Sequence, residues 1–342
     1  MTTTAPSAEA VAAARVLLSQ MGIAPADLVT EAAPVPTFAE AVPLVRARLS
    51  EGTLRTYNTA LTRLVTEWPD RRLDEPSKAE FEERARTIQA GARVNRASRG
   101  GTSAAEHFVS AVRCLYRLAE DNGWIRPADN PARHLKMPAR RPSKRYAIPS
   151  GQLTEICQVA AVTGNDPELD SLLLRLHIET ACRRGGALAL RPHDLDPDQC
   201  LIYLREKDGI DRWQPVSPTL MRHLLDHARQ RRSPRNEQLL RYRNGRPITA
   251  RRFDYIWNRL GAELPWVAAH GMTVHWLRHT TLTWVERTFS YAVASAYAGH
   301  ATKSRGTTST YVKADLHEVA AALAVLTGEP HPLAPDYQPS AR

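Results

Sequence analysis

The chain has 342 residues, 43% of them hydrophobic, and its four cysteines are scattered without a CxxC pair. This composition predicts a globular protein long enough for two domains. The scattered cysteines fit a reducing cytoplasm and argue against a cysteine-based zinc site. No run of about 18 uncharged apolar residues exists, which argues against a transmembrane helix. The sequence also argues against a signal peptide. The net charge of +10, from 46 basic and 36 acidic side chains, suits a polyanionic partner, although a preference for arginine codons would also explain why most basic residues are arginine.

The N-terminal half is predicted to be helical. Residues 1–36 are rich in Ala and Pro and contain one short helix near 8–21. Over 37–138, "EGTLRTYNTALTRLVTEW" and "SAAEHFVSAVRCLYRLAEDNGW" each place apolar residues on one helical face, and Gly123 is a stop signal after the second. We therefore expect a small helical bundle over 37–138, followed by a Pro-rich basic linker at 139–148, although a plain exposed loop would have the same composition.

A second domain is predicted over 149–328, and a Pro-rich, mobile tail over 329–342. Its expected helices are 151–162, 167–182, 184–190, 218–231, 249–263, 274–288 and 315–327. Two strand-like runs, "CLIYLREK" and "DRWQPVS", flank the turn signal Asp208-Gly209. The fold class is therefore mainly α with a small β-sheet (α+β).

The motif "HWLRHTTLTW" places His275 and His279 four residues apart, on one face of a helix. A zinc protease needs a carboxylate beside the first histidine, but Trp276 occupies that place and Arg278 lies one turn along. Thr273 is a candidate N-cap, which would put His275 and Arg278 near free backbone amides that favour an anion. A phosphate site is therefore favoured over zinc, with a buried structural histidine pair as the alternative.

Four further residues complete a pattern. Arg183 follows an apolar helix, and Lys207, the only lysine between residues 145 and 302, lies at the hairpin turn. His300 ends "AYAGH", and Tyr311 lies in "GTTSTYVKADL". The order Arg, Lys, HxxR, GH, TTxxY resembles the catalytic signature of the tyrosine recombinase (phage integrase) family, and the resemblance covers most of the chain. It implies a helical core-binding domain and a catalytic domain.

The resemblance implies that Tyr311 attacks a DNA phosphodiester, which gives a 3′-phosphotyrosine link and a free 5′-hydroxyl. Arg183 and Arg278 would bind the non-bridging oxygens, where two guanidiniums stabilise the charge of the transition state without a metal. A tyrosine with a pKa near 10 is a poor nucleophile at neutral pH, so it needs a base or a positive field. No P-loop or acidic metal cluster is present, and we expect no cofactor and no metal.

The remaining roles are also carried over from the family. Lys207 resembles the general acid for the leaving oxygen, His275 the acid/base histidine, and His300 the residue that orients the phosphate. The sequence departs from the family at Gly186, where a Glu or Asp often follows the first arginine by three residues, so another group would have to support that arginine. Tyr291 and Tyr297 are rival nucleophiles, which we interpret as core residues because they lie in an apolar helical run. Arg184 is a rival to its neighbour, but the following "ALAL" register and the lysine spacing favour Arg183.

Several arginine-rich segments are candidates for DNA contact. Residues 222–252 contain ten arginines and two acids, which favours contact with a DNA backbone. In "ARVNRASRGGTS" three arginines recur every three residues, which fits either a DNA-reading element or a flexible loop. The candidate contacts are Arg93, Arg96, Arg99, Arg140, Arg141, Lys144, Arg145, Arg241, Arg243, Arg251 and Arg252.

We therefore expect a site-specific DNA recombinase that integrates or excises a mobile element, located in the cytoplasm with the nucleoid and without a membrane partner. Its partners would be double-stranded DNA, further copies in a homotetramer on two DNA sites, and an accessory DNA-bending or directionality factor. The apolar stripe of the last helix would pack on its own domain or on a neighbouring protomer. Two alternatives stay open: a DNA-binding regulator with a decayed site, and an enzyme that reseals without exchange, such as a type IB topoisomerase or telomere resolvase.

Overall fold

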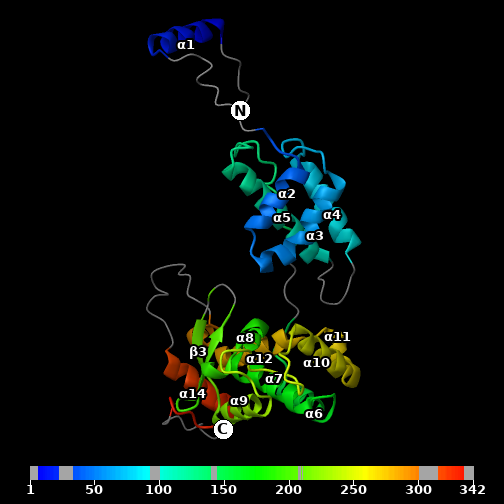
Figure 1. Cartoon of the computed structure of the whole chain (residues 1–342), viewed down its shortest axis with the longest axis vertical. Coiled ribbons are helices and arrows are strands. Elements are labelled where there is room, and N and C mark those ends of the chain that lie inside the picture. The colour runs from blue at the N-terminus through cyan, green and yellow to red at the C-terminus, as the bar shows by residue number, and fades with distance from the viewer. Residues whose placement is uncertain are drawn as a thin grey trace. The chain divides into compact units, whose positions relative to one another are not determined.

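The computed structural model of the protein describes residues 7–22, 34–92, 101–139, 145–206, 209, 211–299 and 315–334. Over these residues the protein is mainly helical with one small three-stranded antiparallel sheet, which confirms the predicted fold class. The chain divides into two compact units, Met1–Arg141 and Pro142–Arg342 (Figure 1). None of the described helices is long and apolar enough to cross a bilayer.

The first unit has a helical core around α5. Its helices are α1 (Ala8–Gln20), α2 (Phe38–Arg48), α3 (Glu51–Glu67), α4 (Lys78–Gly91) and α5 (Thr102–Asp121). The predicted apolar face of α5 is buried against α2, α3 and α4, and Phe81 meets Tyr116 edge to face with ring centroids 5.5 Å apart. The Tyr116 hydroxyl donates a hydrogen bond to the Leu73 carbonyl, so even the most buried phenol of this core has a polar partner.

The second unit combines most of the helices with the sheet. Its helices are α6 (Ser150–Val162), α7 (Pro167–Thr180), α8 (Arg184–Ala189), α9 (Pro218–Gln230), α10 (Ala250–Glu263), α11 (Pro265–His270), α12 (Val274–Thr288), α13 (Tyr291–Tyr297) and α14 (Leu316–Thr327). Its strands are β1 (Leu195–Asp196), β2 (Leu201–Arg205) and β3 (Asp211–Pro215). The strands β2 and β3 form the predicted hairpin, in which Leu201 pairs with Pro215 and Arg205 pairs with Asp211. The hairpin loop contains Gly209 at φ 69°, a left-handed conformation that glycine adopts without strain.

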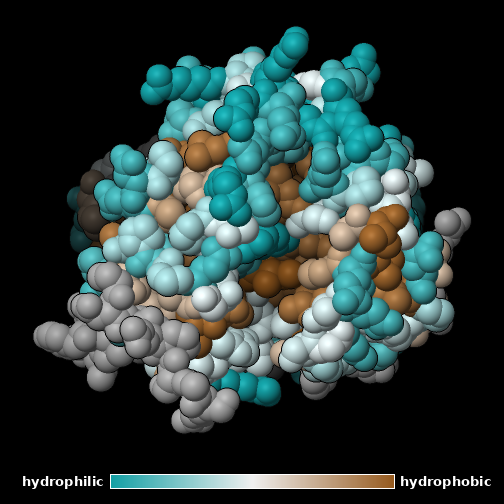
Figure 2. All heavy atoms as spheres, turned by 90° about the horizontal axis from the view of Figure 1, so that it is seen from below, coloured by the Kyte–Doolittle hydropathy of each residue, from teal (hydrophilic) through white to brown (hydrophobic). Residues whose placement is uncertain are grey.

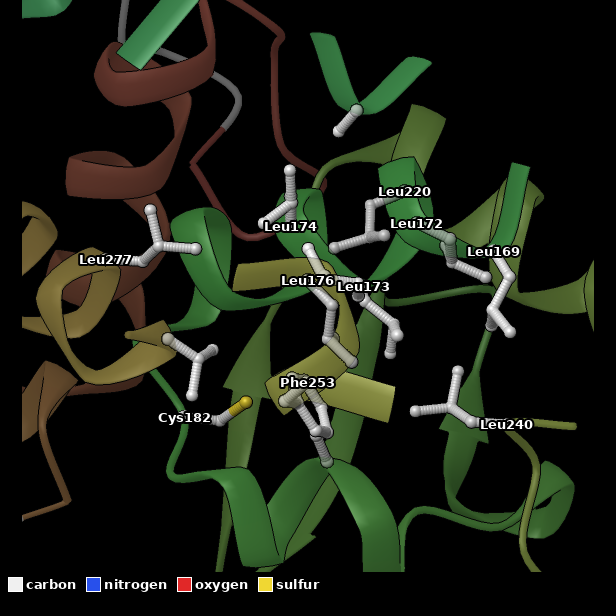
Figure 3. Packing of buried hydrophobic residues seen from close by; sticks show 14 of the residues in the cluster. Leu169, Leu172, Leu173, Leu174, Leu176, Cys182, Leu220, Leu240, Phe253 and Leu277 are labelled. Carbon is white, nitrogen blue, oxygen red and sulfur yellow. The ribbon is translucent and has the colours of Figure 1, made fainter. Parts of the chain in front are cut away.

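The core of this unit gathers around α7, which is buried along most of its length. Figure 3 shows the α7 leucines together with Phe253 of α10 and Leu277 of α12, and all of these side chains belong to one buried cluster. Nine of the fourteen residues of α7 are buried, so α7 is a central helix of the unit. Arg183 lies three residues after the C-terminal end of α7 and contacts Glu206, which directly follows β2.

The helix α14 packs on its own unit. Val319 and Leu323 are buried against Val285 and Tyr297, and Asp315 caps the helix in a reciprocal capping box with Glu318. Nearby, α6, α7 and α14 border a groove lined largely by apolar residues, and Figure 2 shows one face of the molecule on which hydrophobic residues occupy hollows between hydrophilic ones.

Candidate active site

Three of the six predicted catalytic residues, Arg183, His275 and Arg278, are described by the structure. The other three, Lys207, His300 and Tyr311, lie outside the described residues. So do six of the predicted DNA contacts, namely Arg93, Arg96, Arg99, Arg140, Arg141 and Lys144. Among the described residues, no group of three His, Cys, Asp or Glu side chains could hold a metal ion.

Arg183 is positioned by an abrupt end of α7. Ala181 caps that helix in a left-handed conformation, at φ 49°, and the chain then turns so that Arg183 occupies the N-cap position of α8. The helix therefore ends two residues earlier than the sequence predicted. The Arg183 side chain is 32% exposed, and its Nη1 donates to Oε2 of Glu206 at 2.8 Å. Its backbone amide donates to Oε1 of the same carboxylate at 2.5 Å.

Arg278 enters the same region from α12. Its guanidinium is buried and donates to two backbone carbonyls, one from Ala181 and one from Ala298 at 2.7 Å. It therefore bridges the end of α7 and the end of α13, the segment that leads to His300. Burial and the charges of the neighbouring Arg183 and Arg212 outweigh the opposing charge of Glu206 and lower the pKa of Arg278 to about 10. The guanidinium remains charged at neutral pH.

His275 lies in the first turn of α12, one turn before Arg278. Thr273 occupies the N-cap position, as predicted, but its side chain makes no capping hydrogen bond. Partial burial lowers the pKa of His275, and the charges of Arg145, Arg278 and other neighbours lower it further. His275 is therefore neutral at neutral pH, which suits a group that accepts a proton.

His279, the second histidine of the motif, contacts a backbone carbonyl and a threonine hydroxyl. Its Nε2 lies 3.3 Å from the Arg145 carbonyl oxygen and its Nδ1 lies 3.1 Å from the Thr283 hydroxyl. The two histidines of the motif thus differ in environment, and His275 is the one on which the charges of Arg183 and Arg278 act.

Two residues of this site were not predicted from the sequence. Glu206 accepts hydrogen bonds from Arg183 and, at 2.9 Å, from Nη1 of Arg212. The available signals were indirect: Glu206 is the neighbour of Lys207, and the absence of an acid at Gly186 required a substitute. Arg212 lies across the hairpin from Leu204, but nothing in its local sequence distinguishes it from the many other arginines.

Two of the predicted DNA contacts are corrected by the structure. Arg241 and Arg252 are buried, with 7% and 3% of their surface exposed. Arg241 donates to Glu237 and to two backbone carbonyls, and Arg252 donates to Asp170 and Asn165. These guanidiniums are engaged within the fold, and their burial leaves little of either one exposed for a phosphate. In contrast, Arg145, Arg243 and Arg251 are exposed.

The rival catalytic residues separate by burial. Tyr297 is fully buried, and its hydroxyl donates to the Glu179 carbonyl, so it is a core residue as predicted. Tyr291 is 74% exposed, and its assignment to the core was wrong because it begins the short helix α13 on the outer side. Arg184 points away toward Asp254, at 3.6 Å, which leaves Arg183 as the arginine beside Glu206.

Comparison with known proteins identifies the family and the fold. Residues 148–318, half of the chain, match the phage integrase family. A lambda integrase tetramer bound to a Holliday junction has a similar fold, with a TM-score of 0.61 and 16% identity over 87% of both chains. The Tn1549 transposon integrase in complex with transposon right end DNA gives 0.59 and 15% identity over 85% of this chain and all of the other. No curated protein matches the sequence. The described arginines, the sheet and the family match together identify the chain as a member of the phage integrase family, the site-specific recombinases of the tyrosine type.

Proposed function

We propose that this recombinase cuts and rejoins DNA through a 3′-phosphotyrosine intermediate formed by Tyr311. The observation that carries the proposal is the convergence of Arg183 and Arg278, which lie 95 residues apart in the sequence, on one carboxylate beside a neutral His275. A guanidinium has five N–H donors, so the contact of Arg183 with Glu206 leaves donors for a phosphate. Such a pair suits the equatorial oxygens of a phosphoryl transition state.

In the proposed reaction, the Tyr311 oxygen forms a bond to phosphorus and the bond from phosphorus to the 5′ oxygen breaks. His275 accepts the tyrosine proton, and Lys207 gives a proton to the leaving 5′ oxygen. The covalent intermediate conserves the energy of the broken bond. A 5′-hydroxyl from the same or another strand then attacks the phosphotyrosine, which reseals the DNA without ATP.

The proposal extends to the DNA substrate and to assembly. The solved lambda integrase of similar fold is a tetramer bound to a Holliday junction, and we infer a homotetramer of this chain on two double-stranded DNA sites. We also propose that the protein integrates or excises a mobile element and that an accessory DNA-bending or directionality factor assists it. Its location would be the cytoplasm, with the nucleoid. The exposed Arg145, Arg243 and Arg251, together with the predicted contacts outside the described residues, would bind the DNA backbone.

The proposal is tested by detecting the covalent adduct between the protein and DNA. The protein is expressed in cells that carry its genomic neighbourhood, DNA is recovered under denaturing conditions, and the DNA attached to protein is sequenced. We expect adducts at discrete sites for the wild type and none for Tyr311→Phe. Tyr291→Phe is the matched control, because Tyr291 is exposed but lies outside the proposed chemistry.

Each other outcome has a definite meaning. Adducts that persist in Tyr311→Phe would show that another residue is the nucleophile. If no variant gives an adduct while binding to DNA is retained, the protein is a regulator with a decayed site. If adducts form and reseal on single sites without any exchange between two sites, the protein acts like a type IB topoisomerase or a telomere resolvase.

A further inference from the structure

The carboxylate of Glu206 lies in the interior of the second unit, directly after β2 and next to Lys207 in the sequence. Its side chain has no exposed surface. Oε2 accepts from Nη1 of Arg183 at 2.8 Å and from Nη1 of Arg212 at 2.9 Å, while Nη1 of Arg278 lies 4.0 Å from Oε1. Three guanidiniums therefore surround one buried carboxylate.

This carboxylate is ionised in the folded protein. Burial alone would raise the pKa of Glu206, but the charge of Arg212, the Arg183 amide and the charge of Arg278 outweigh burial, so the pKa lies below its usual value. A buried ion is tolerated only when partners compensate for the lost water. With three cations around one anion, the group keeps a positive excess, which is the charge that a phosphodiester requires.

The space for this carboxylate depends on Gly186. A Cβ atom at residue 186 would lie 3.0 Å from Cγ and 3.3 Å from Oε1 of Glu206. Any side chain at Gly186 would thus compete with Glu206 for one volume beside Arg183. The family often has an acidic residue at the position of Gly186 in α8. In this chain the carboxylate of Glu206, which directly follows β2, occupies the space beside Gly186.

Arg212 connects this place to the end of α13. Its Nη2 donates to the Tyr297 carbonyl at 3.2 Å and its Nε donates to Gln214 at 3.1 Å. Gly299 permits this approach, since a Cβ there would lie 2.5 Å from the Arg212 guanidinium, and its φ of 62° is one that glycine adopts freely. Glu206 and Arg212 therefore link the turn that carries Arg183 to the segment before His300.

We infer that Glu206 is the positioning residue for the phosphate-binding arginines: it orients Arg183 directly, faces Arg278, and replaces the acidic residue absent at Gly186, with Arg212 as its second anchor. This inference rests on the proposed function, because it concerns the same phosphate site. It predicts that the carboxylate is needed in this volume, whichever residue supplies it.

The experiment measures the rate of phosphotyrosine formation in a single turnover, on the DNA site recovered by adduct sequencing, together with DNA affinity and thermal unfolding. Glu206→Gln keeps the shape and removes the charge, and we expect it to slow cleavage between about 10- and 100-fold, as when an outer partner of a site ligand is lost. DNA affinity should change little, because most of it comes from many backbone contacts.

The decisive variant moves the carboxylate. Gly186→Asp combined with Glu206→Ala places an acid in the same volume from α8, and we expect it to cleave at least about tenfold faster than Glu206→Ala alone. A merely structural role would not be restored in this way. The matched control is Asp194→Asn, which removes another buried carboxylate of the sheet region, paired with Arg205 at 2.6 Å, and should lower stability but not the cleavage rate.

The outcomes separate this inference from the proposed function. If the wild type forms the adduct and folded Glu206→Gln cleaves equally fast, the positioning role is refuted while the proposed function stands. If Glu206→Gln does not fold, the paired comparison of Glu206→Ala with the double variant decides, and equal rates in those two refute the role. If the wild type forms no adduct, the proposed function fails and this inference fails with it.

Discussion

Arg183 and Arg278 are proposed to bind the same phosphate, but the protein holds them in different ways. Arg278 is buried and donates to the carbonyls of Ala181 and Ala298, so it is part of the fold before any DNA arrives. Arg183 is about one-third exposed and has a single carboxylate partner. The same substitution should therefore have different consequences at the two positions.

We expect Arg278→Lys to lower both stability and cleavage, and Arg183→Lys to lower mainly cleavage. A lysine cannot span the two carbonyls that Arg278 joins, and each buried carbonyl left without a donor costs about 1–3 kcal/mol. Urea unfolding and single-turnover cleavage of both variants measure the two effects. Equal losses of stability at the two positions would show that the burial of Arg278 has no energetic importance.

A second prediction at this scale concerns pH. His275 is proposed to accept a proton, and its pKa is lowered by partial burial and by neighbouring cations. The cleavage rate should therefore fall only when the pH drops below the ordinary histidine value of about 6.5. A single-turnover pH profile measures the midpoint, and His275→Gln should remove this limb, whereas the exposed His223→Gln should keep it. A midpoint at or above the ordinary value contradicts the prediction.

At the scale of elements, the periodicity of apolar residues predicted the longer helices and the strand hairpin. The helix expected at 274–288 is α12, and the two expected strands form the β2–β3 hairpin. The two-residue β1 was not predicted, because two residues are too few to establish a period.

The candidate site could be predicted only in part, for a related physical reason. The family motif located Arg183, His275 and Arg278, which the structure brings together. The burial of Arg252 depends on Asp170, which lies 82 residues away, and the position of Glu206 depends on an empty volume beside Gly186. No local pattern encodes such a pairing between distant segments.

The contact between α9 and the loop that follows it should make the free energy of unfolding depend on pH. His227 accepts a hydrogen bond from the Arg241 amide at 3.1 Å, and burial, together with the charge of Arg231, lowers the pKa of His227 to about 4. The unfolded chain binds this proton near pH 6.5, so folding loses stability as the pH falls from there toward 4. The loss should reach about 3 kcal/mol.

Urea unfolding at pH 7 and at pH 4 measures this effect in the wild type and in His227→Gln. Glutamine keeps an acceptor for the Arg241 amide but has no proton to gain. We therefore expect the variant to lose less stability than the wild type on acidification, by an amount close to that contribution. Identical losses in both proteins would show that His227 is not the titrating group.

At the scale of the whole molecule, the net charge of +10 does not act as a uniform positive surface. Of the ten arginines in 222–252, Arg231, Arg241 and Arg252 are buried in ion pairs with acids of the same unit. Exposed members such as Arg243 and Arg251 remain available to a polyanion. Some arginines of this chain therefore stabilise the fold, and others are available for the proposed DNA contact. Composition alone does not tell which arginines belong to which group.

The adjacent pair Arg251 and Arg252 tests this division. Arg251→Ala should weaken DNA binding and reduce the slope of log affinity against log salt by about one, as expected for the loss of one phosphate contact. Arg252→Ala should leave the slope unchanged in the folded protein. It should instead lower the free energy of unfolding by about 1.5–3 kcal/mol, because the buried Asp170 would lose its hydrogen bond from Arg252 and keep only the one from Arg259.

The two variants control for each other, since they remove the same charge from neighbouring residues of one helix. Affinity titrations at several salt concentrations and urea unfolding are measured on both. If Arg252→Ala changes the salt slope as much as Arg251→Ala does, the buried arginine contributes to the long-range field at DNA. If neither changes the slope, this face of the second unit does not contact DNA, and the backbone contacts must come from the other basic segments.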